Sequence, residues 1–422
     1  MSGASSSEAA AGRDDDFRMT PLERNASLWL ALLYGARMLG MFLILPVFAV
    51  HAAGMPGGGN AALVGLAFGV YGLTQALFQI PFGAASDRFG RRPVITAGLL
   101  LMLAGSLVAA TADTLAGLTL GRALQGAGAV SAAISALVAD TTRDSQRTKA
   151  MSLVGAMIGV SFAFSLVAAP LLYRAVGLSG IFFVTALLAA VGIAILWWLI
   201  PAPDRAANAS GTAAADGTAA AGAGGLRRLL DGDMMRLNFG IFVLHLTQMT
   251  LFVVVPSRLV GLAGLPLSEH WKIYLPVVVA SFAVMMPPLN WAERMGRVRG
   301  LFLLAIGAQL VSQLGFAFVP PGLGSISVFL LLFFISFNML EALLPSLQSR
   351  LAPAGGRGAV MGIFSTTQSL GIFTGGALGG LLAHYLGDTS VFLASALFIA
   401  VWALVARGAR RWPGRHGLGA QA

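Results

Sequence analysis

The chain is 422 residues long, with 57% hydrophobic and only 10% charged residues. A soluble domain averages about 25% charged residues, so this chain cannot cover a water-facing surface. Its mean hydropathy of +0.81 indicates that lipid is its main solvent. The formal net charge is +10, and the absence of cysteine excludes disulfides and thiolate metal sites.

The first 27 residues are polar and include an acidic run at 14–16. A cleavable signal needs a basic start followed directly by an apolar core, and this segment has no such order. It is therefore predicted to be a short disordered cytoplasmic tail in front of an uncleaved first helix.

Long apolar segments recur along the rest of the chain. A helix that crosses about 30 Å of hydrocarbon requires about 20 mostly apolar residues. Each segment is expected to be α-helical, because lipid offers the backbone no other hydrogen-bond partner. The sequence thus predicts an all-α integral membrane protein with twelve transmembrane helices. They are expected at residues 28–50, 61–82, 93–111, 115–139, 149–173, 179–200, 237–257, 271–292, 300–319, 325–349, 358–384 and 389–406.

The basic residues alternate between the two sides of these predicted spans. Nearly all of the 27 Lys and Arg fall in the tails, the central linker and every second loop. Only Arg174, Arg258 and Lys272 fall in the opposite loops, and Arg37 and Arg122 fall inside spans. Cytoplasmic loops carry the excess of positive charge, so both termini are expected to be cytoplasmic. The membrane topology then explains the net positive charge, and a nucleic-acid partner is not needed to account for it.

The spans form two sets of six around a polar segment. Residues 202–225 have the composition of a flexible linker, and residues 226–237 resemble an amphipathic segment at the membrane surface. The segment 88–91 recurs as 294–297 with both arginines and the glycine kept. Such repeats predict two pseudo-symmetric bundles with a site between them. The expected parts are a tail (1–27), a six-helix bundle (28–200), a linker (201–236), a second six-helix bundle (237–406) and a tail (407–422).

Residues 83–92 gather four charges between the second and third spans in the sequence GAASDRFGRR. A cytoplasmic loop explains the arginines, but it explains neither the acid nor the glycines at positions 83 and 90. A small residue lets helices approach closely, a glycine permits positive φ, and an acid can face the N-terminus of a neighbouring helix. The predicted helix-linking residues are Gly83, Asp87, Arg88, Gly90, Arg91 and Arg92, with Asp140 at the end of span four on the same face.

This pattern resembles the loop signature of the major facilitator superfamily. LG (39–40) with LPV (45–47) is similar to the first-helix motif of its twelve-span drug:proton antiporters, and GRALQGAGA (121–129) is similar to their fourth-helix motif. RMLGMFLILPV, YGLTQALFQIPFG, FNMLEALLPSL and HWKIYL are similar to its YajR-like branch. The resemblance extends from about residue 28 to 406 and implies the superfamily fold.

The resemblance also implies a conformational latch. By motif position, Asp87 would meet the N-terminus of the helix predicted at 358–384, and Arg91 would pair with Asp140. These contacts would hold an outward-facing state and break on inward opening. In span five, residues 169–174 keep Pro170 but lack the glycines typical of antiporters, so symport stays open beside antiport.

Four ionisable side chains fall deep within predicted spans, away from their ends, where each costs at least about 2.5–3.5 kcal/mol. Glu341 is expected to carry protons, or else to lock helices in an internal ion pair. The resemblance implies a role in proton coupling for Arg122. The alternative is a structural role, in which its side chain is hydrogen-bonded to carbonyl groups. Arg37 is expected to line the pore, where an unpaired cation would repel cationic solutes and favour anionic or neutral amphiphiles. His245 can titrate near physiological pH or simply be hydrogen-bonded.

Several amides in the spans could bind a substrate or join helices. They are Gln75, Gln79, Gln125, Gln248, Asn338 and Gln368.

Together these features predict a proton-coupled secondary transporter, an efflux antiporter of small amphiphilic solutes or drugs in the cell (inner) membrane. A proton gradient would drive it without a cofactor, and the family default is a monomer. The chain has no GxxxxGK[ST] segment and no cluster of metal ligands, which argues against ATP drive, a metal site and an enzyme. A proton-independent facilitator, a proton symporter and a non-transporting membrane sensor are the alternatives.

Overall fold

The structure, a computed structural model, describes residues 19–200, 231–352 and 357–408, and every regular element in this part of the chain is helical. Most of the predicted tails and linker lie outside the described residues. In chain order the helices are α2 (Pro21–Phe42), α3 (Phe48–Ala53), α4 (Ala61–Phe89), α5 (Arg91–Ala110), α6 (Leu115–Ala127), α7 (Ser131–Asp140), α8 (Asp144–Trp198), α11 (Gly232–Gly261), the 3₁₀ turn η2 (Leu267–Glu269), α12 (Trp271–Met295), α13 (Val298–Phe318), α14 (Leu323–Leu351), α15 (Arg357–Leu386) and α16 (Asp388–Arg407).

Ten helical segments of the described chain are long and apolar enough to cross a membrane. One of them, Lys149–Trp198, contains Gly177 with a non-helical φ of 67°, so it makes two crossings. The remaining crossing is α2 with α3, in which Glu23, Arg24 and Arg37 lower the apolar character. The all-α fold with twelve predicted spans is confirmed.

Two helices begin elsewhere than the apolar pattern alone indicates. Helix α2 begins at Pro21, inside the predicted tail, because Thr20 and Glu23 form a capping box around its first turn. Helix α11 begins at Gly232, so the described part of the predicted surface segment is continuous with span seven.

Glu23 joins the start of α2 to the start of α8. Its carboxylate accepts from the backbone N–H of Arg143 at 2.9 Å and from Arg143 Nε and Nη2 at 2.9 and 3.1 Å. These hydrogen bonds lower the pKa of Glu23 to about 2. The first and fifth spans are therefore held together where both begin.

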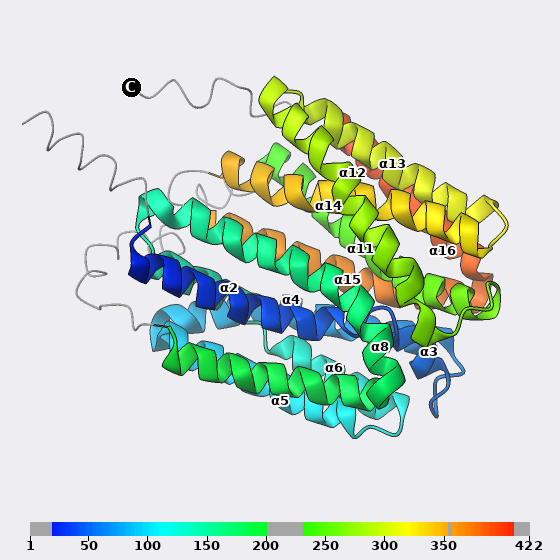
Figure 1. The fold of residues 1–422 in the computed structure, drawn as a ribbon, viewed down its shortest axis with the longest axis horizontal. Helices are drawn as coiled ribbons and strands as arrows, with labels where there is room; N and C mark the ends of the chain where they lie inside the picture. The colour runs from blue at the N-terminus through cyan, green and yellow to red at the C-terminus, as the bar shows by residue number, and fades with distance from the viewer. Residues whose placement is uncertain (1–18, 201–230, 353–356, 409–422) are drawn as a thin grey trace, which may run out of the picture.

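The helices form two halves, which Figure 1 shows as a lower half coloured blue to green (α2 to α8) and an upper half coloured green to red (α11 to α16). In the first half α2 packs on α8 and α5 packs on α6, and in the second α11 packs on α15 and α13 packs on α14. The halves meet mainly along α4 and α15. We call the end with the α4–α5 connection the arginine-rich end, and the end with the α5–α6 connection the arginine-poor end.

Glycines bring α4 and α15 into backbone contact toward the arginine-poor end. A Cβ atom on Gly65 would lie 2.3 Å from the carbonyl oxygen of Gly376, and one on Gly69 would lie 2.6 Å from that of Phe373. Toward the arginine-rich end, a Cβ on Gly83 would meet only Ala132 of its own half, and one on Gly362 would meet nothing within 4 Å. The two helices are thus closed at the arginine-poor end and diverge toward the other.

Spans one and four are each interrupted within their length. Turns at 43–47 separate α2 from α3, and residues 128–130 separate α6 from α7. Gly128 fits the second break because a Cβ there would lie 2.3 Å from the carbonyl oxygen of Gly98. Irregular backbone within a span is tolerated where it is buried in protein.

Candidate functional site

The charged segment 83–92 lies at the junction of two helices. Helix α4 continues to Phe89, so Gly83, Asp87 and Arg88 lie on its last turns rather than in the predicted loop. Gly90 alone breaks the helix, with a φ of 95°, and Arg91 begins α5. Gly296 repeats this in the second half with a φ of 69°. Gly90 is the residue type that this sharp reversal requires.

Arg91 is the centre of this junction. Its Nε donates to Asp140 Oδ2 at 2.9 Å, and its Nη1 donates to Ser86 Oγ at 2.8 Å and to Asp87. Burial lowers the pKa of Arg91, but the bonds to Asp140 and Asp87 outweigh it and raise the pKa overall. The contact of Arg91 with Asp140 that the family resemblance implies is therefore present between α5 and α7.

Asp87 does not make the interhelix contact that the resemblance implies. Its side chain is 54% exposed, and its partner in the described part of the chain is Arg91, not α15. The divergence of α4 from α15 at this end explains the difference. Arg88 and Arg92 also lie apart from Asp140: Arg88 covers the ring of Phe89, and Arg92 donates to the carbonyl oxygen of Ile200.

A second group of polar side chains lies inside the second half. Glu341 on α14, His245 on α11 and Gln368 on α15 converge: Gln368 Nε2 lies 2.7 Å from His245 Nε2 and 3.5 Å from Glu341 Oε1. His245 Nδ1 contacts the carbonyl oxygen of Ile241 at 3.2 Å, which places its proton on Nδ1 and leaves Nε2 to accept. Glu341 Oε2 lies 3.7 Å from His245 Nε2. The sequence had placed these three residues on separate spans without pairing them.

A third group lies in the first half around Tyr71 of α4. Arg37 on α2 donates from Nη2 to Tyr71 Oη at 3.4 Å, and the guanidinium carbon of Arg122 on α6 lies 4.7 Å from the centre of the tyrosine ring. Arg122 also donates to Gln125 Oε1 at 2.9 Å, and Gln125 donates to Ser106 Oγ at 2.8 Å. Gln125 therefore orients Arg122. In the sequence Tyr71 stands out only as the first residue of the segment YGLTQALFQIPFG, and no pattern in one sequence indicates its partners.

The remaining predicted amides divide into two kinds. Asn338 joins helices, since its Nδ2 donates to Ser281 Oγ of α12 at 3.1 Å. Gln75, Gln79 and Gln248 are buried, and the Oε1 atoms of Gln75 and Gln79 have no hydrogen-bond partner among the described residues. These two lie on α4 one and two turns beyond Tyr71 toward the arginine-rich end.

Aromatic rings also connect the two halves. Phe162 of α8 lies 5.9 and 5.8 Å, between ring centres, from Phe334 and Phe337 of α14. It also lies 5.1 Å from Phe42 of α2, and Phe337 lies 5.8 Å from the ring of His245. The second polar group thus borders this aromatic contact through His245.

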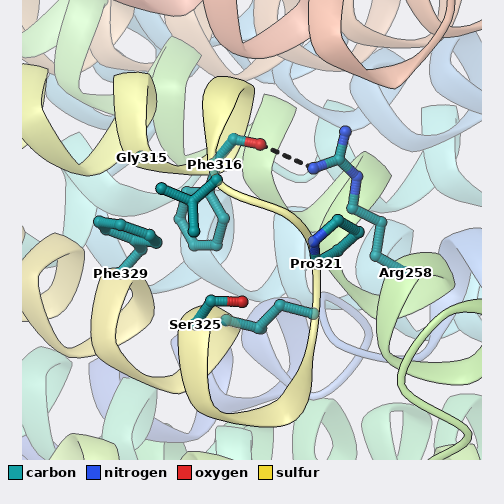
Figure 2. Close-up of a pocket in the computed structure, with 8 residues that line it drawn as sticks. Arg258, Gly315, Phe316, Pro321, Ser325 and Phe329 are labelled. Carbon is teal, nitrogen blue, oxygen red and sulfur yellow. Dashed lines mark hydrogen bonds between the residues drawn. The ribbon is translucent and has the colours of Figure 1, made fainter.

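Arg258, predicted in a loop, lies instead in the last turn of α11, and Figure 2 shows it at a small pocket between α11, α13 and α14. It donates to the carbonyl oxygen of Phe316 at 2.8 Å and to Asp388 at 3.2 Å. Its guanidinium also covers the ring of Phe392 at 4.6 Å. These contacts fasten helix ends within the second half at the arginine-poor end.

The described residues contain no group of three or more side chains that could hold a metal ion. Deep within the described spans, the ionisable groups available for chemistry are the two arginines around Tyr71, Glu341 and His245.

A model of the major facilitator superfamily matches residues 30–375. The chain belongs to the major facilitator superfamily. It is 40% identical over 392 residues to the inner membrane transport protein YajR of Escherichia coli (strain K12), covering 93% of this chain and 85% of that protein. It is 28% identical over 372 residues to the multidrug resistance protein MdtH of Aeromonas hydrophila, covering 82% and 85%.

Solved structures share the fold at low sequence identity. A D-xylose–proton symporter superposes with a TM-score of 0.70 at 16% identity, covering 92% of this chain and 97% of that one. The human organic anion transporter MFSD10 (TETRAN) superposes with a TM-score of 0.65 at 20% identity, covering 92% and 100%. The predicted superfamily and its YajR-like branch are confirmed, and the chain is a multi-pass membrane transporter.

Proposed function

We propose that this transporter is driven by protons and that Glu341 carries them. The observation that supports this most is the setting of Glu341: its partners in the described chain are His245 and Gln368, and no arginine or lysine is among them. A carboxylate at this depth costs at least about 2.5–3.5 kcal/mol. The charge of Glu341 is therefore linked to any movement that changes its access to water or to a cation.

His245 gives the proton a second position. Its Nε2 faces Glu341 Oε2 at 3.7 Å, and Oε2 has no hydrogen-bond partner among the described residues. A small approach of the two side chains would let the proton pass between them. Arg122, which the resemblance links to coupling, lies in the other half and acts on this pair only through the contact of the halves.

The contact of the halves supports a mechanism of alternating access. In this conformation α4 and α15 touch toward the arginine-poor end and diverge toward the arginine-rich end. Rocking about the α4–α15 contact would close the arginine-rich end and open the arginine-poor end. In the closed conformation Asp87 would reach α15 and latch the arginine-rich end, with Gly83, Arg88, Gly90 and Arg92 at the same helix junction. The bond between Arg91 and Asp140 is already present while this end is open. It would therefore hold α5 on α7 in both conformations, rather than break on opening as the resemblance implies.

The direction of transport is proposed from the relatives and from the positive charges. The name of YajR places that relative in an inner membrane, and the name of MdtH describes multidrug resistance. We therefore assign this chain efflux of small amphiphilic solutes from an inner membrane. Its arginine-rich end and both termini would face the cytoplasm, and it would act as a monomer without a cofactor.

The test is transport of a panel of fluorescent amphiphiles into or out of proteoliposomes that carry an imposed pH gradient. The Glu341→Gln variant should lose the gradient-driven component while it is produced and folded as the wild type. Glu269→Gln is the matched control, because Glu269 pairs with Lys272 in the exposed turn at the arginine-poor end. It should transport at the wild-type rate.

Each alternative gives a different result. Gradient-driven transport by Glu341→Gln at the wild-type rate would remove Glu341 as the carrier. A wild-type rate that survives collapse of the gradient would identify a facilitator. Solute movement in the same direction as the protons would identify a symporter, and the absence of both solute movement and proton flux would favour a sensor.

A further inference from the structure

Two arginines share one tyrosine in the interior of the first half. Arg37 and Arg122 are 2% and 1% exposed, and they reach Tyr71 from α2 and α6 on different sides: one at its hydroxyl group, the other over its ring. Two buried positive charges next to each other repel, so the arrangement requires a compensating negative charge.

The first half contains no acid that could supply this charge. Between residues 21 and 200 the acids are Glu23, Asp87, Asp113, Asp140 and Asp144, and each lies at or beside a helix end. Glu23 is bonded to Arg143, and Asp87 and Asp140 are bonded to Arg91. The membrane-spanning stretches of this half therefore hold two cations and no anion.

The guanidinium groups also have free donors. Arg37 Nε and Nη1 and Arg122 Nε are buried and have no hydrogen-bond partner within the described chain. A buried donor on a charged group costs more than about 1–3 kcal/mol when it has no acceptor. A cation–π contact with Tyr71 offsets about 2 kcal/mol of this for Arg122, but it satisfies none of these N–H groups.

One of the two guanidinium groups is held in place by other side chains. Gln125 fixes Arg122 and is itself fixed by Ser106 on α5. Such support is typical of arginines that bind a planar or tetrahedral anion through paired N–H donors. A water molecule could satisfy a donor here, but it would leave the charge uncompensated.

We propose that Arg37 and Arg122 bind the anionic group of the transported solute, so that the substrate is an amphiphilic organic anion such as a carboxylate or sulfonate. This inference rests on the proposed function of the chain as a solute transporter.

The contact of the halves links this anion site to Glu341. Gly72, next to Tyr71, packs on the carbonyl oxygen of Ser369, and Ser369 follows Gln368, the partner of Glu341. An anion that moves Tyr71 therefore acts on the helix segment that positions Glu341. Binding of the anion and of the proton would be coupled through backbone contact.

The test uses three probes with the same ring and different charge. Naphthalene-2-sulfonate, 2-naphthalenemethanol and 2-naphthylmethylammonium are added to purified protein, and binding is followed by the shift of the apparent melting temperature. The sulfonate should raise it, and the neutral and cationic probes should not. Arg37→Gln and Arg122→Gln should each weaken sulfonate binding at least tenfold, whereas Arg174→Gln, which removes an exposed arginine at the arginine-poor end, should not.

A measurement of stability without ligand distinguishes loss of binding from loss of the fold. Arg37→Met removes an uncompensated buried charge, so it should raise the melting temperature without ligand and abolish the sulfonate response. A sulfonate response that persists in Arg37→Met and Arg122→Gln would overturn the proposal, as would equal responses to all three probes.

The same variants separate this inference from the proposed proton coupling. Glu341→Gln should still bind the sulfonate while it loses gradient-driven transport. If it binds the sulfonate and transports at the wild-type rate, the coupling proposal fails and the anion site stands. If gradient-driven transport of neutral or cationic probes depends on Glu341 but not on Arg37 or Arg122, the anion site fails and the coupling stands.

Discussion

The backbone contact of α4 with α15 predicts that one added methyl group changes the conformational equilibrium. In Gly376→Ala the new Cβ would lie 2.7 Å from both the Cα and the N of Gly69, and 2.8 Å from the carbonyl oxygen of Gly65. Non-bonded carbon atoms prefer about 3.5–4.0 Å. The obstructing atoms are backbone, so no side-chain rotation can make room, and the two helices must separate by about 1 Å.

This separation costs free energy only in the conformation where the helices touch. Overpacking of a close contact costs about 1–3 kcal/mol, and the conformation that opens the arginine-poor end does not bear this cost. The equilibrium between the two should therefore shift roughly 5- to 150-fold toward opening of the arginine-poor end.

The natural absence of cysteine provides the assay. Ser369→Cys introduces a single thiol at a position that is 3% exposed and packed beside Gly72 in the contact. Its rate of modification by a water-soluble maleimide reports the population in which the contact is open. Addition of Gly376→Ala should raise that rate by the same roughly 5- to 150-fold factor.

Gly362→Ala is the matched control. It makes the same substitution on the same helix, and its Cβ would have no atom within 4 Å. The gain in helix propensity is about equal in both variants, so only the contact differs. Equal modification rates in the two variants, or slower modification in Gly376→Ala, would refute the reasoning.

Two further predictions concern charged contacts. Arg91→Asp and Asp140→Arg should each lower the transport rate, because a partly exposed ion pair of this kind contributes about 1 kcal/mol. The double variant, in which the two charges are exchanged, should restore part of the rate. If it does not, the contact has no role in transport. The pKa of Glu23 is lowered from 4.5 to about 2 by its bonds to Arg143, so the pair stabilises the fold above about pH 4.5 and this stabilisation disappears as the pH falls toward 2. Glu23→Gln should thus lower the free energy of unfolding by about 1–3 kcal/mol at pH 7, given the partly exposed Arg143. The melting temperature of this variant should fall less steeply in acid than that of the wild type. The same dependence of melting temperature on pH in both proteins would contradict the assignment.

The spans could be predicted from the sequence because lipid imposes length and apolar composition on every crossing. The ends of helices were harder to predict, since they depend on local capping. Thr20 with Glu23 extends α2 into the expected tail, and α4 continues through Asp87 because nothing before Gly90 ends it. The capping signal at Thr20 was present in the sequence, but the polar composition of its surroundings concealed it.

Side-chain partners between helices lay largely beyond sequence reasoning. The pairing of Arg91 with Asp140 was expected only through the family resemblance, and the expected contact of Asp87 with span eleven depends on which end of the molecule is closed. Tyr71 shows the limit most clearly. Its meeting with Arg37 and Arg122 is set by the packing angles of three helices, which hydropathy does not encode.

The breaks in spans one and four have a mechanical consequence for the residues on either side of them. Arg122 lies on α6, before the break at 128–130, and Asp140 lies on α7, after it. A continuous helix would transmit any tilt of the segment with Arg122 rigidly to the segment with Asp140. Because span four is broken at 128–130, the segment with Arg122 can change its tilt while the segment with Asp140 keeps its position. Under the proposed mechanism, binding of a solute and opening of the arginine-rich end would then be separate steps.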